Sequence, residues 1–306
     1  MRADGDISAD GDGRTAAVAA TGGVIRLGAA ECFATLSGAL WWPAQNTLVV
    51  ADLHLEKGSS LARSRQFLPP YDTAETLGRL GRIIAALHPA RVVALGDSFH
   101  DGGGPARLDA AARAHLAALM AGREWLWITG NHDPDLPASF RHADAGGTAT
   151  DETAADRTGS GGAAIRNPEI RDAGIGGTVA AEAEIGGIVL RHEPSPVAGG
   201  PCEIAGHLHP VARVPARDRV IRRRCFAAGR RRLVLPAFGA LAGGLDVRDP
   251  AFAAVLPQAD FTAHILGRER IYSLPATALC QPPQSRRNTT PPSQPVRSAS
   301  ATTSAP

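Results

Sequence analysis

Residues 47–54 have the sequence TLVVADLH, a short apolar run followed by an aspartate and a histidine. The same arrangement recurs as RVVALGD at 91–97 and as EWLWITGNHD at 124–133. Between these runs, apolar residues over 73–87 and 106–120 recur at nearly a helical period. We therefore predict a β-α-β-α-β unit, which implies a parallel sheet with right-handed crossovers.

The second half of the chain changes character. Short strand-like runs cover 184–191, 202–206, 220–227 and 231–236, and 228–230 is typical of a hairpin connection. A β-α-β half joined to a strand-rich half predicts an α/β fold. We expect two mixed sheets packed face to face with helices outside, and polar side chains gathered at the carboxyl ends of the strands.

Three segments are predicted to lie outside the core. Residues 1–22 are small, polar and aperiodic, which predicts a disordered N-terminal tail. Residues 144–177 are rich in Ala, Gly and Thr and predict a disordered insertion. Residues 281–306 are rich in Ser, Thr, Pro and Gln and predict a disordered C-terminal tail. A single domain is then expected over 23–280.

Bulk properties exclude several classes of protein. A hydrophobic content of 44% and a charged content of 20% are near globular averages. The net charge of +2 is too small to argue for nucleic acid by itself, so such binding must come from local patches. The four cysteines are scattered, no apolar run is long enough to span a bilayer, and no secretory signal is evident. We expect a cytoplasmic protein that does not contact a membrane.

Polar residues that can bind metal follow five of the predicted strands. A DxH or HxH pair in extended backbone directs both side chains to the same side, although either pair alone is a weak signal. A carboxylate after a strand can bridge two cations, as Asp97 is placed to do. Together the segments predict two divalent ions and metal-assisted hydrolysis of a phosphate ester. The seven candidate ligands are Asp52, His54, Asp97, Asn131, His192, His207 and His209.

Further residues near these segments suggest catalytic roles. His132 follows Asn131 and is predicted to contact a phosphoryl oxygen or to protonate the leaving alkoxide. Asp133 is predicted to orient that imidazole. A plain Asn-His turn is the alternative interpretation of this tetrapeptide.

Substrate contacts are less specific. Lys57, the only lysine, follows the DLH segment and is either a point charge for a phosphate or a solvated lysine. His100 either lines the mouth of the site or lies in a simple loop. Arg222, Arg223 and Arg224, with 230–232, form a compact basic patch if they flank one hairpin. The alternative is ordinary solvated charge in an arginine-rich chain.

The order DxH, GD, GNHD, H, GHxH resembles the calcineurin-like metallophosphoesterase superfamily over roughly residues 24–275. The resemblance implies an αββα sandwich with a two-metal site and His132 as the catalytic histidine. Many members carry GDxxD, whereas His100 stands at the last of these positions here. The resemblance also implies the two ligand sets, which are Asp52, His54, Asp97 and His209 for one ion and Asp97, Asn131, His192 and His207 for the other.

Other stretches resemble one bacterial subfamily, the ligase-associated DNA damage response metallophosphoesterases, whose members are described as endonucleases. This resemblance implies DNA as the substrate and a DNA ligase and a helicase as partners. The stretches that carry it are 50–60, 68–73, 206–210, 222–226 and 235–239.

The function predicted from these observations is phosphodiester hydrolysis by a metal-bridging hydroxide, with His132 protonating the departing oxygen. Manganese is the preferred ion because mixed nitrogen and oxygen ligands suit it, and iron and zinc are alternatives. The metal ligands alone are equally consistent with a small-molecule phosphatase or a cyclic nucleotide phosphodiesterase. A non-catalytic interaction scaffold is the third hypothesis.

Overall fold

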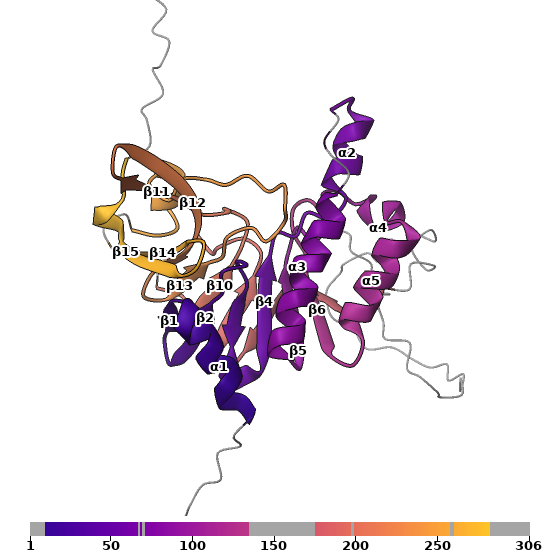
Figure 1. The fold of residues 1–306 in the computed structure, drawn as a ribbon, viewed down its shortest axis with the longest axis horizontal. Helices are drawn as coiled ribbons and strands as arrows, with labels where there is room; N and C mark the ends of the chain where they lie inside the picture. The colour runs from indigo at the N-terminus through magenta and orange to yellow at the C-terminus, as the bar shows by residue number, and fades with distance from the viewer. Residues whose placement is uncertain are drawn as a thin grey trace, which may run out of the picture.

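The computed structural model describes residues 10–66, 68, 71–134, 175–196, 199–257 and 260–281. Two mixed β-sheets pack face to face and are flanked by helices (Figure 1). The α/β sandwich predicted from the sequence is therefore confirmed. None of the helices within the described ranges combines the length and the apolar character that a bilayer-crossing segment needs.

The first sheet contains the β-α-β-α-β unit. Its strands are antiparallel from β1 to β4 and parallel from β4 to β7. Ala51, Leu95 and Ile128 are in register, so the carboxyl ends of β4, β5 and β6 lie together. The strands β1 to β7, neighbours in that order, are Val24–Leu27, Ala30–Ala34, Leu40–Trp42, Thr47–Ala51, Arg91–Leu95, Glu124–Ile128 and Thr178–Ala180.

The second sheet has the order β15-β14-β12-β13-β10-β9-β8, and β11 pairs with β12. Strands β9, β10 and β13 are parallel, so their carboxyl ends also share one edge. The predicted hairpin between β12 and β13 is confirmed, since Gly229 N–H donates to the Arg232 carbonyl at 2.8 Å. Strands β8 to β15 are Glu182–Ile185, Ile188–Arg191, Glu203–Ala205, Val211–Ala216, Arg219–Ala228, Arg232–Val234, Thr262–Leu266 and Ile271–Pro275.

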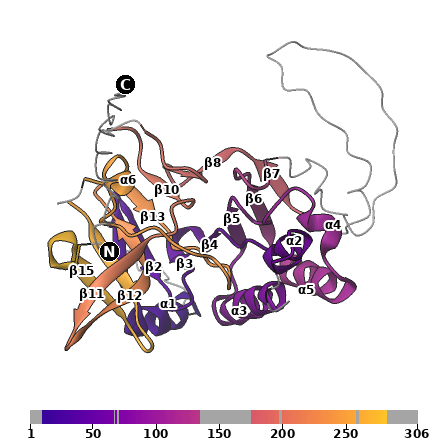
Figure 2. The same cartoon turned by 90° about the horizontal axis from the view of Figure 1, so that it is seen from above.

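Apolar side chains fill three layers. The layer between the sheets includes Val49, Ile128, Leu190 and Phe226, all buried. A second layer lies between the first sheet and helices α3 and α5, which Figure 2 shows together on one face. A third lies on the outer face of the second sheet, against α6. The helices are α1 (Asp10–Thr21), α2 (Lys57–Arg63), α3 (Asp72–Leu87), α4 (Gly104–Arg107), α5 (Ala110–Met120) and α6 (Pro250–Ala253), with 3-10 turns at Pro43–Gln45 and Ala276–Ala278.

Two predicted elements are divided in the structure. The helix expected over 106–120 is interrupted, because Asp109 is extended and its side chain caps α5 by accepting the Ala112 N–H at 2.7 Å. The strand expected over 184–191 is a hairpin of β8 and β9. Gly186 and Gly187 both have positive φ, as a tight two-residue hairpin turn requires.

The N-terminal segment also differs from its prediction. Helix α1 covers Asp10–Thr21, within the stretch expected to be disordered. Its Val18 is buried in the layer under α3, and Arg14 donates to the Leu87 carbonyl at 3.4 Å. The disorder predicted for 144–177 and 281–306 falls almost entirely on residues outside the described ranges. The domain limits at residues 23 and 280 stay a prediction.

Candidate metal centre

All seven predicted ligands lie just beyond the carboxyl ends of five parallel strands. Strands β4, β5 and β6 of the first sheet are followed by the DLH, GD and GNHD segments, and β9 and β10 of the second sheet by the remaining histidines. The site therefore draws on both sheets. The residues that follow these strands are Asp52 and His54, Asp97, Asn131, His192, and His207 and His209, respectively.

The backbone at five of these positions is left-handed. The φ angles of Asp52, His54, Asp97, His207 and His209 are 53°, 43°, 45°, 66° and 46°. The argument that alternate residues of an extended strand face the same side is therefore wrong for both pairs, although each pair does reach one site. Non-glycine residues in this region are uncommon and are concentrated at functional sites, where surrounding structure holds them.

Asp52, His54 and His209 form the first ligand cluster, with one ligand atom of each within 4.8 Å of the others. His209 Nε2 lies 3.3 Å from His54 Nε2 and 3.3 Å from Asp52 Oδ1. Asp52 is fully buried, and its carboxylate also accepts the backbone N–H of His207 at 3.1 and 3.2 Å. This hydrogen bond fixes the carboxylate while leaving it within reach of an ion.

The second cluster contains Asp97, His192 and His207, and Asn131 lies among them. His192 Nδ1 lies 3.0 Å from the Leu95 carbonyl, which only accepts, so Nδ1 donates there and Nε2 is directed at the site. That Nε2 faces Asn131 Oδ1 at 2.9 Å and His207 Nδ1 at 3.1 Å. Several potential ligand atoms therefore converge on one point.

Asp97 lies between the two clusters. Its Oδ1 is 3.4 Å from His192 Nε2, and its Oδ2 is 3.9 Å from His54 Nε2. The side chain is buried, and Oδ1 accepts the backbone N–H of His132 at 2.9 Å. One oxygen thus faces each cluster, which is the placement that a bridging carboxylate requires.

The donor atoms fit divalent cations. His192 Nε2 and Asn131 Oδ1 lie 2.9 Å apart, and an imidazole nitrogen and an amide oxygen are both ligands that divalent cations accept. His54 Nδ1 is buried without a hydrogen-bond partner among the described residues. Burial, and then the neighbouring His209, lower the pKa of His54 to about 2, so its imidazole is neutral, as a metal ligand must be.

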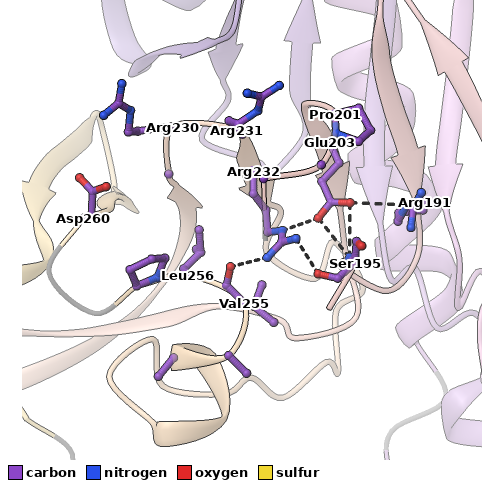
Figure 3. A pocket seen from close by; sticks show the side chains of 16 residues that line it. Arg191, Ser195, Pro201, Glu203, Arg230, Arg231, Arg232, Val255, Leu256 and Asp260 are labelled. Atoms are coloured by element: carbon purple, nitrogen blue, oxygen red, sulfur yellow. Dashed lines mark hydrogen bonds and ion pairs between the residues drawn. The ribbon is translucent and has the colours of Figure 1, made fainter. Parts of the chain in front are cut away.

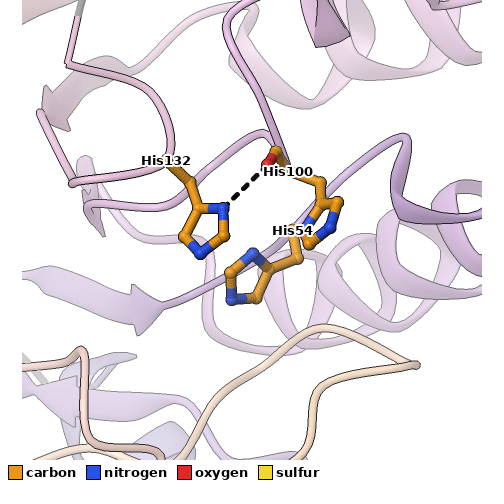
Figure 4. Close-up of side chains that lie close together, drawn as sticks. All are labelled: His54, His100 and His132. Atoms are coloured by element: carbon orange, nitrogen blue, oxygen red, sulfur yellow. Dashed lines mark hydrogen bonds between the residues drawn. The ribbon is translucent and has the colours of Figure 1, made fainter. Parts of the chain in front are cut away.

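His132 lies beside these clusters. Its Nε2 is 4.0 Å from Asp97 Oδ2, and its side chain is 40% exposed, so a substrate can reach it. Figure 4 shows its Nδ1 directed at the His100 carbonyl, to which it donates at 2.8 Å. The rings of His100 and His132 stack with centroids 5.0 Å apart, and the His54 ring meets His132 edge-on at 5.2 Å. His100 therefore lies at the site rather than in a remote loop.

Asp133 has a different role from the one predicted. Its Oδ1 accepts the N–H groups of Asp97 and Gly130 at 3.1 and 2.9 Å, and its Oδ2 accepts that of Phe99 at 3.0 Å. The prediction that it orients the His132 imidazole is wrong, because the His100 carbonyl holds that ring. Burial raises the pKa of the Asp133 carboxyl to about 6, against the effect of these backbone donors.

Lys57 begins α2, three residues after His54, and is half-buried. Its charge contributes to the lowered pKa of both His54 and His100, although burial is the larger cause in each case. Contact with a substrate phosphate stays a prediction.

The predicted basic patch is not continuous. Arg222 and Arg223 are exposed on β12, whereas Arg224 is half-buried and donates to the Ala237 carbonyl at 2.8 Å. Arg222 and Gly229 are seven residue steps apart along extended chain, a distance of about 23 Å. The first arginine triplet therefore lies in the middle of β12, and the second lies beyond its carboxyl end.

The second triplet, Arg230–Arg232, lines a cavity of about 360 Å³ near the starts of β10 and β13. Figure 3 shows Arg232 directed inward to Glu203, while Arg230 and Arg231 point away from that buried pair. Glu203 is also 3.5 Å from Arg191 Nε. Two of the four cationic groups are thus neutralised, and none of the predicted metal ligands lines this cavity.

Two features of the site were not anticipated from the sequence. A Cβ at Gly130 would lie 2.2 Å from both N and Oδ1 of Asp97, so only glycine permits this approach. The segment after β13 supports the other side of the site, since Phe238 N–H donates to the Ala51 carbonyl at 2.8 Å and Gly239 N–H to that of Asp52 at 3.0 Å. Gly130, directly before Asn131, is the sequence signal that could have indicated the close approach to Asp97.

Comparison with protein families agrees with this geometry. Residues 46–169 match the family described as calcineurin-like phosphoesterase. The matched region contains Asp52, His54, Asp97, Asn131 and His132. The chain carries a calcineurin-like phosphoesterase domain. This phosphoesterase is thus a metal-dependent phosphoester hydrolase of a family that uses a dinuclear centre, and the two ligand clusters are its candidate metal-binding residues.

Among solved structures, the phosphoesterase is similar to the crystal structure of Pseudomonas putida nuclease MPE. The two chains are 23% identical, the match covers 83% of this chain and 100% of that one, and the TM-score is 0.54. The similarity supports the same fold. No curated protein matches the chain.

Proposed function

We propose that the phosphoesterase is a dinuclear, metal-dependent phosphodiesterase whose substrate is DNA. The observation that carries the proposal is the Asp97 carboxylate, which turns one oxygen toward each ligand cluster. The choice of DNA is supported by the fold similarity to a protein named as a nuclease and by the subfamily resemblance of the sequence.

We assign the ligands by cluster. Mixed imidazole, amide and carboxylate donors suit manganese, and iron and zinc are the alternatives. One ion would be held by Asp52, His54, Asp97 and His209, and the other by Asp97, Asn131, His192 and His207.

Two divalent ions bound there would lower the pKa of a shared water and neutralise charge on the phosphoryl oxygens. The chain supplies orientation. The Leu95 carbonyl holds His192 with Nε2 toward the site, and the His100 carbonyl holds His132 in the same manner. His132 Nε2 is then free to give a proton to the departing oxygen of the phosphodiester.

The test is metal analysis followed by substrate profiling of the reconstituted protein. We expect a pair of ions per chain and hydrolysis of both DNA and bis-p-nitrophenyl phosphate, with p-nitrophenyl phosphate and cyclic nucleotides turned over more slowly. Asp97→Asn should reduce the metal content as well as the rate. Preference for monoesters or cyclic nucleotides would favour a small-molecule enzyme, and a loaded but inert protein would favour a scaffold.

A role in DNA repair, and a DNA ligase or helicase as partner, are proposed on the sequence resemblance alone. Co-purification of the tagged protein with a ligase or helicase from its own cells would support this part of the proposal. Manganese and a cytoplasmic location also stay predictions, the latter consistent with four free cysteines.

A further inference from the structure

Strands β11 and β12 form a ribbon that extends beyond the second sheet. Residues 225–228 of β12 pair with β14 or β13, whereas residues 219–224 pair only with β11 within the described chain. Ala216 pairs with Arg219, which leaves Arg217 and Asp218 as the turn. In Figure 1 this ribbon lies at the upper left and α2 at the upper right. Both elements are on the side of the molecule at which the carboxyl end of β4 lies.

The ribbon carries arginines that have no acidic partner. Over residues 211–224 the one acidic residue is Asp218. Strand arginines elsewhere are paired, as in Arg91–Glu124 at 2.7 Å and Arg191–Glu182 at 2.8 Å. Within the ribbon, Arg213 pairs with Asp246 at 2.9 Å. Within the ribbon, the exposed arginines that form no ion pair with any described residue are Arg217, Arg219, Arg222 and Arg223.

The base of the ribbon is joined to the metal centre. Cys225 N–H donates to the Pro210 carbonyl at 3.0 Å, directly after His209. The guanidinium of Arg222 donates to the Gly244 carbonyl. A Cβ on Gly244 would lie 2.4 Å from the His209 carbonyl oxygen, so Gly244 lies against that ligand. Arg222 is therefore linked through Gly244 to the backbone of a proposed ligand, and the ribbon continues outward from there.

We propose that this ribbon binds the phosphate backbone of a DNA strand on one side of the scissile phosphate. The inference rests on the proposed function and adds the path of the substrate to it. From Arg224 to the turn, the ribbon is about 20 Å long, which is the length of roughly six steps of a B-form strand. Guanidinium groups that lack an ion pair along this length can bind successive phosphates. Each phosphate would accept hydrogen bonds from N–H groups that lie in the plane of the guanidinium.

The test compares two triple variants of the metal-loaded protein. Arg217→Gln/Arg219→Gln/Arg223→Gln removes three ribbon charges. The matched control, Arg230→Gln/Arg231→Gln/Arg268→Gln, removes three exposed charges elsewhere. Binding of a fluorescein-labelled single strand of about 20 nucleotides, longer than one typical binding site, is measured by anisotropy over a salt series. Phosphorothioate linkages in the probe resist hydrolysis.

We expect the ribbon variant to bind the strand about tenfold more weakly and to reduce the slope of log K against log salt by about 2, since each lost contact to a single strand contributes about 0.7. The control variant should keep the wild-type slope. Arg217→Lys/Arg219→Lys/Arg223→Lys should restore most of the slope, because the charge is retained. Matching thermal midpoints for all variants would show that the fold is intact.

Equal slopes for the wild type and the ribbon variant, or equal losses in both triple variants, would overturn the inference. The proposed function is judged separately, by hydrolysis of bis-p-nitrophenyl phosphate and DNA by the wild type. If the wild type hydrolyses both substrates and the ribbon variant keeps the wild-type salt slope, the proposed function stands and the proposed role of the ribbon is rejected. If the wild type hydrolyses neither substrate, the proposed function is rejected, whatever the salt slope.

Discussion

The Asp133 carboxylate accepts the backbone N–H of Asp97 at 3.1 Å, and so ties the loop after β6 to the loop after β5. The same side chain accepts the N–H groups of Gly130 and Phe99. Because Asp133 is buried, these donors have no alternative partner in water. The position of the bridging carboxylate in our proposal therefore depends on a residue that is not itself a ligand.

Asp133→Ala should weaken metal binding more than it alters the chemistry. Loss of the acceptor leaves three backbone donors unsatisfied, at a cost of about 1–3 kcal/mol each in the least relaxed case. We expect metal affinity to fall about 10–100-fold, the usual effect of removing an outer partner of a ligand. Calorimetric metal titration measures this fall. Unchanged metal affinity together with a large loss of turnover would instead support the catalytic role predicted for Asp133 from the sequence.

His132→Ala should separate turnover from metal content. The imidazole lies outside both ligand clusters in our assignment, so the ions should stay bound while the rate falls about 10²–10⁴-fold. Metal analysis and hydrolysis of bis-p-nitrophenyl phosphate on the same sample give both readings. His115→Ala on helix α5 is the control and should change neither. Parallel loss of metal and rate would mean that His132 is a ligand.

Gly130→Ala should damage the centre although it adds one methyl group. The new Cβ would lie 2.2 Å from N and Oδ1 of Asp97, a contact that backbone cannot tolerate, so Asp97 must move. We expect at least a tenfold loss of metal affinity, following the displacement of a shared ligand. Gly102→Ala is the matched control, since its Cβ would meet nothing within 4 Å. Similar metal titrations for the two variants would contradict the close approach.

His264 should make stability depend on pH independently of the metal centre. It is buried on β14, with Nδ1 2.8 Å from Ser273 Oγ, and burial lowers its pKa from 6.5 to about 4. The unfolded chain binds this proton more readily, so stability is complete above about pH 6.5 and falls by roughly 3 kcal/mol as the pH drops to about 4.

His264→Gln should remove that part of the pH dependence. Chemical unfolding of wild type and variant between about pH 4 and pH 8 measures the difference, to which the histidines of the centre contribute equally in both proteins. Parallel curves for the two proteins would show that His264 does not lose its charge on folding.

The sequence predicted the parallel core well because its signals are local. The apolar runs at 47–51 and 91–95 coincide with β4 and β5, since buried parallel strands are apolar on both faces. The helix over 106–120 was predicted too long because alanine continues a helical pattern through the break, and only the Asp109 cap marks it. The Gly186-Gly187 turn was overlooked within an otherwise continuous strand pattern.

The ligands were identifiable for a similar reason, but their contacts were not. Asp, Asn and His after successive strands indicate a shared edge, whichever way each side chain points. The left-handed backbone at Asp52 and His54, and the choice of the His100 carbonyl over Asp133 as partner of His132, depend on tertiary contacts between distant loops. The splitting of the arginine patch likewise depended on the register of β11, β12 and β13.

Asp97 and Asn131 follow strands of one sheet, and His192 and His207 follow strands of the other. An ion bound by these four residues would therefore cross-link the two sheets. Loading should then raise the temperature at which the two halves of the chain come apart, by an amount that grows with free ion concentration. Metal binding would in turn depend on the packing of the two sheets against each other. In a cell that lacks the metal, the protein would therefore be less stable as well as inactive.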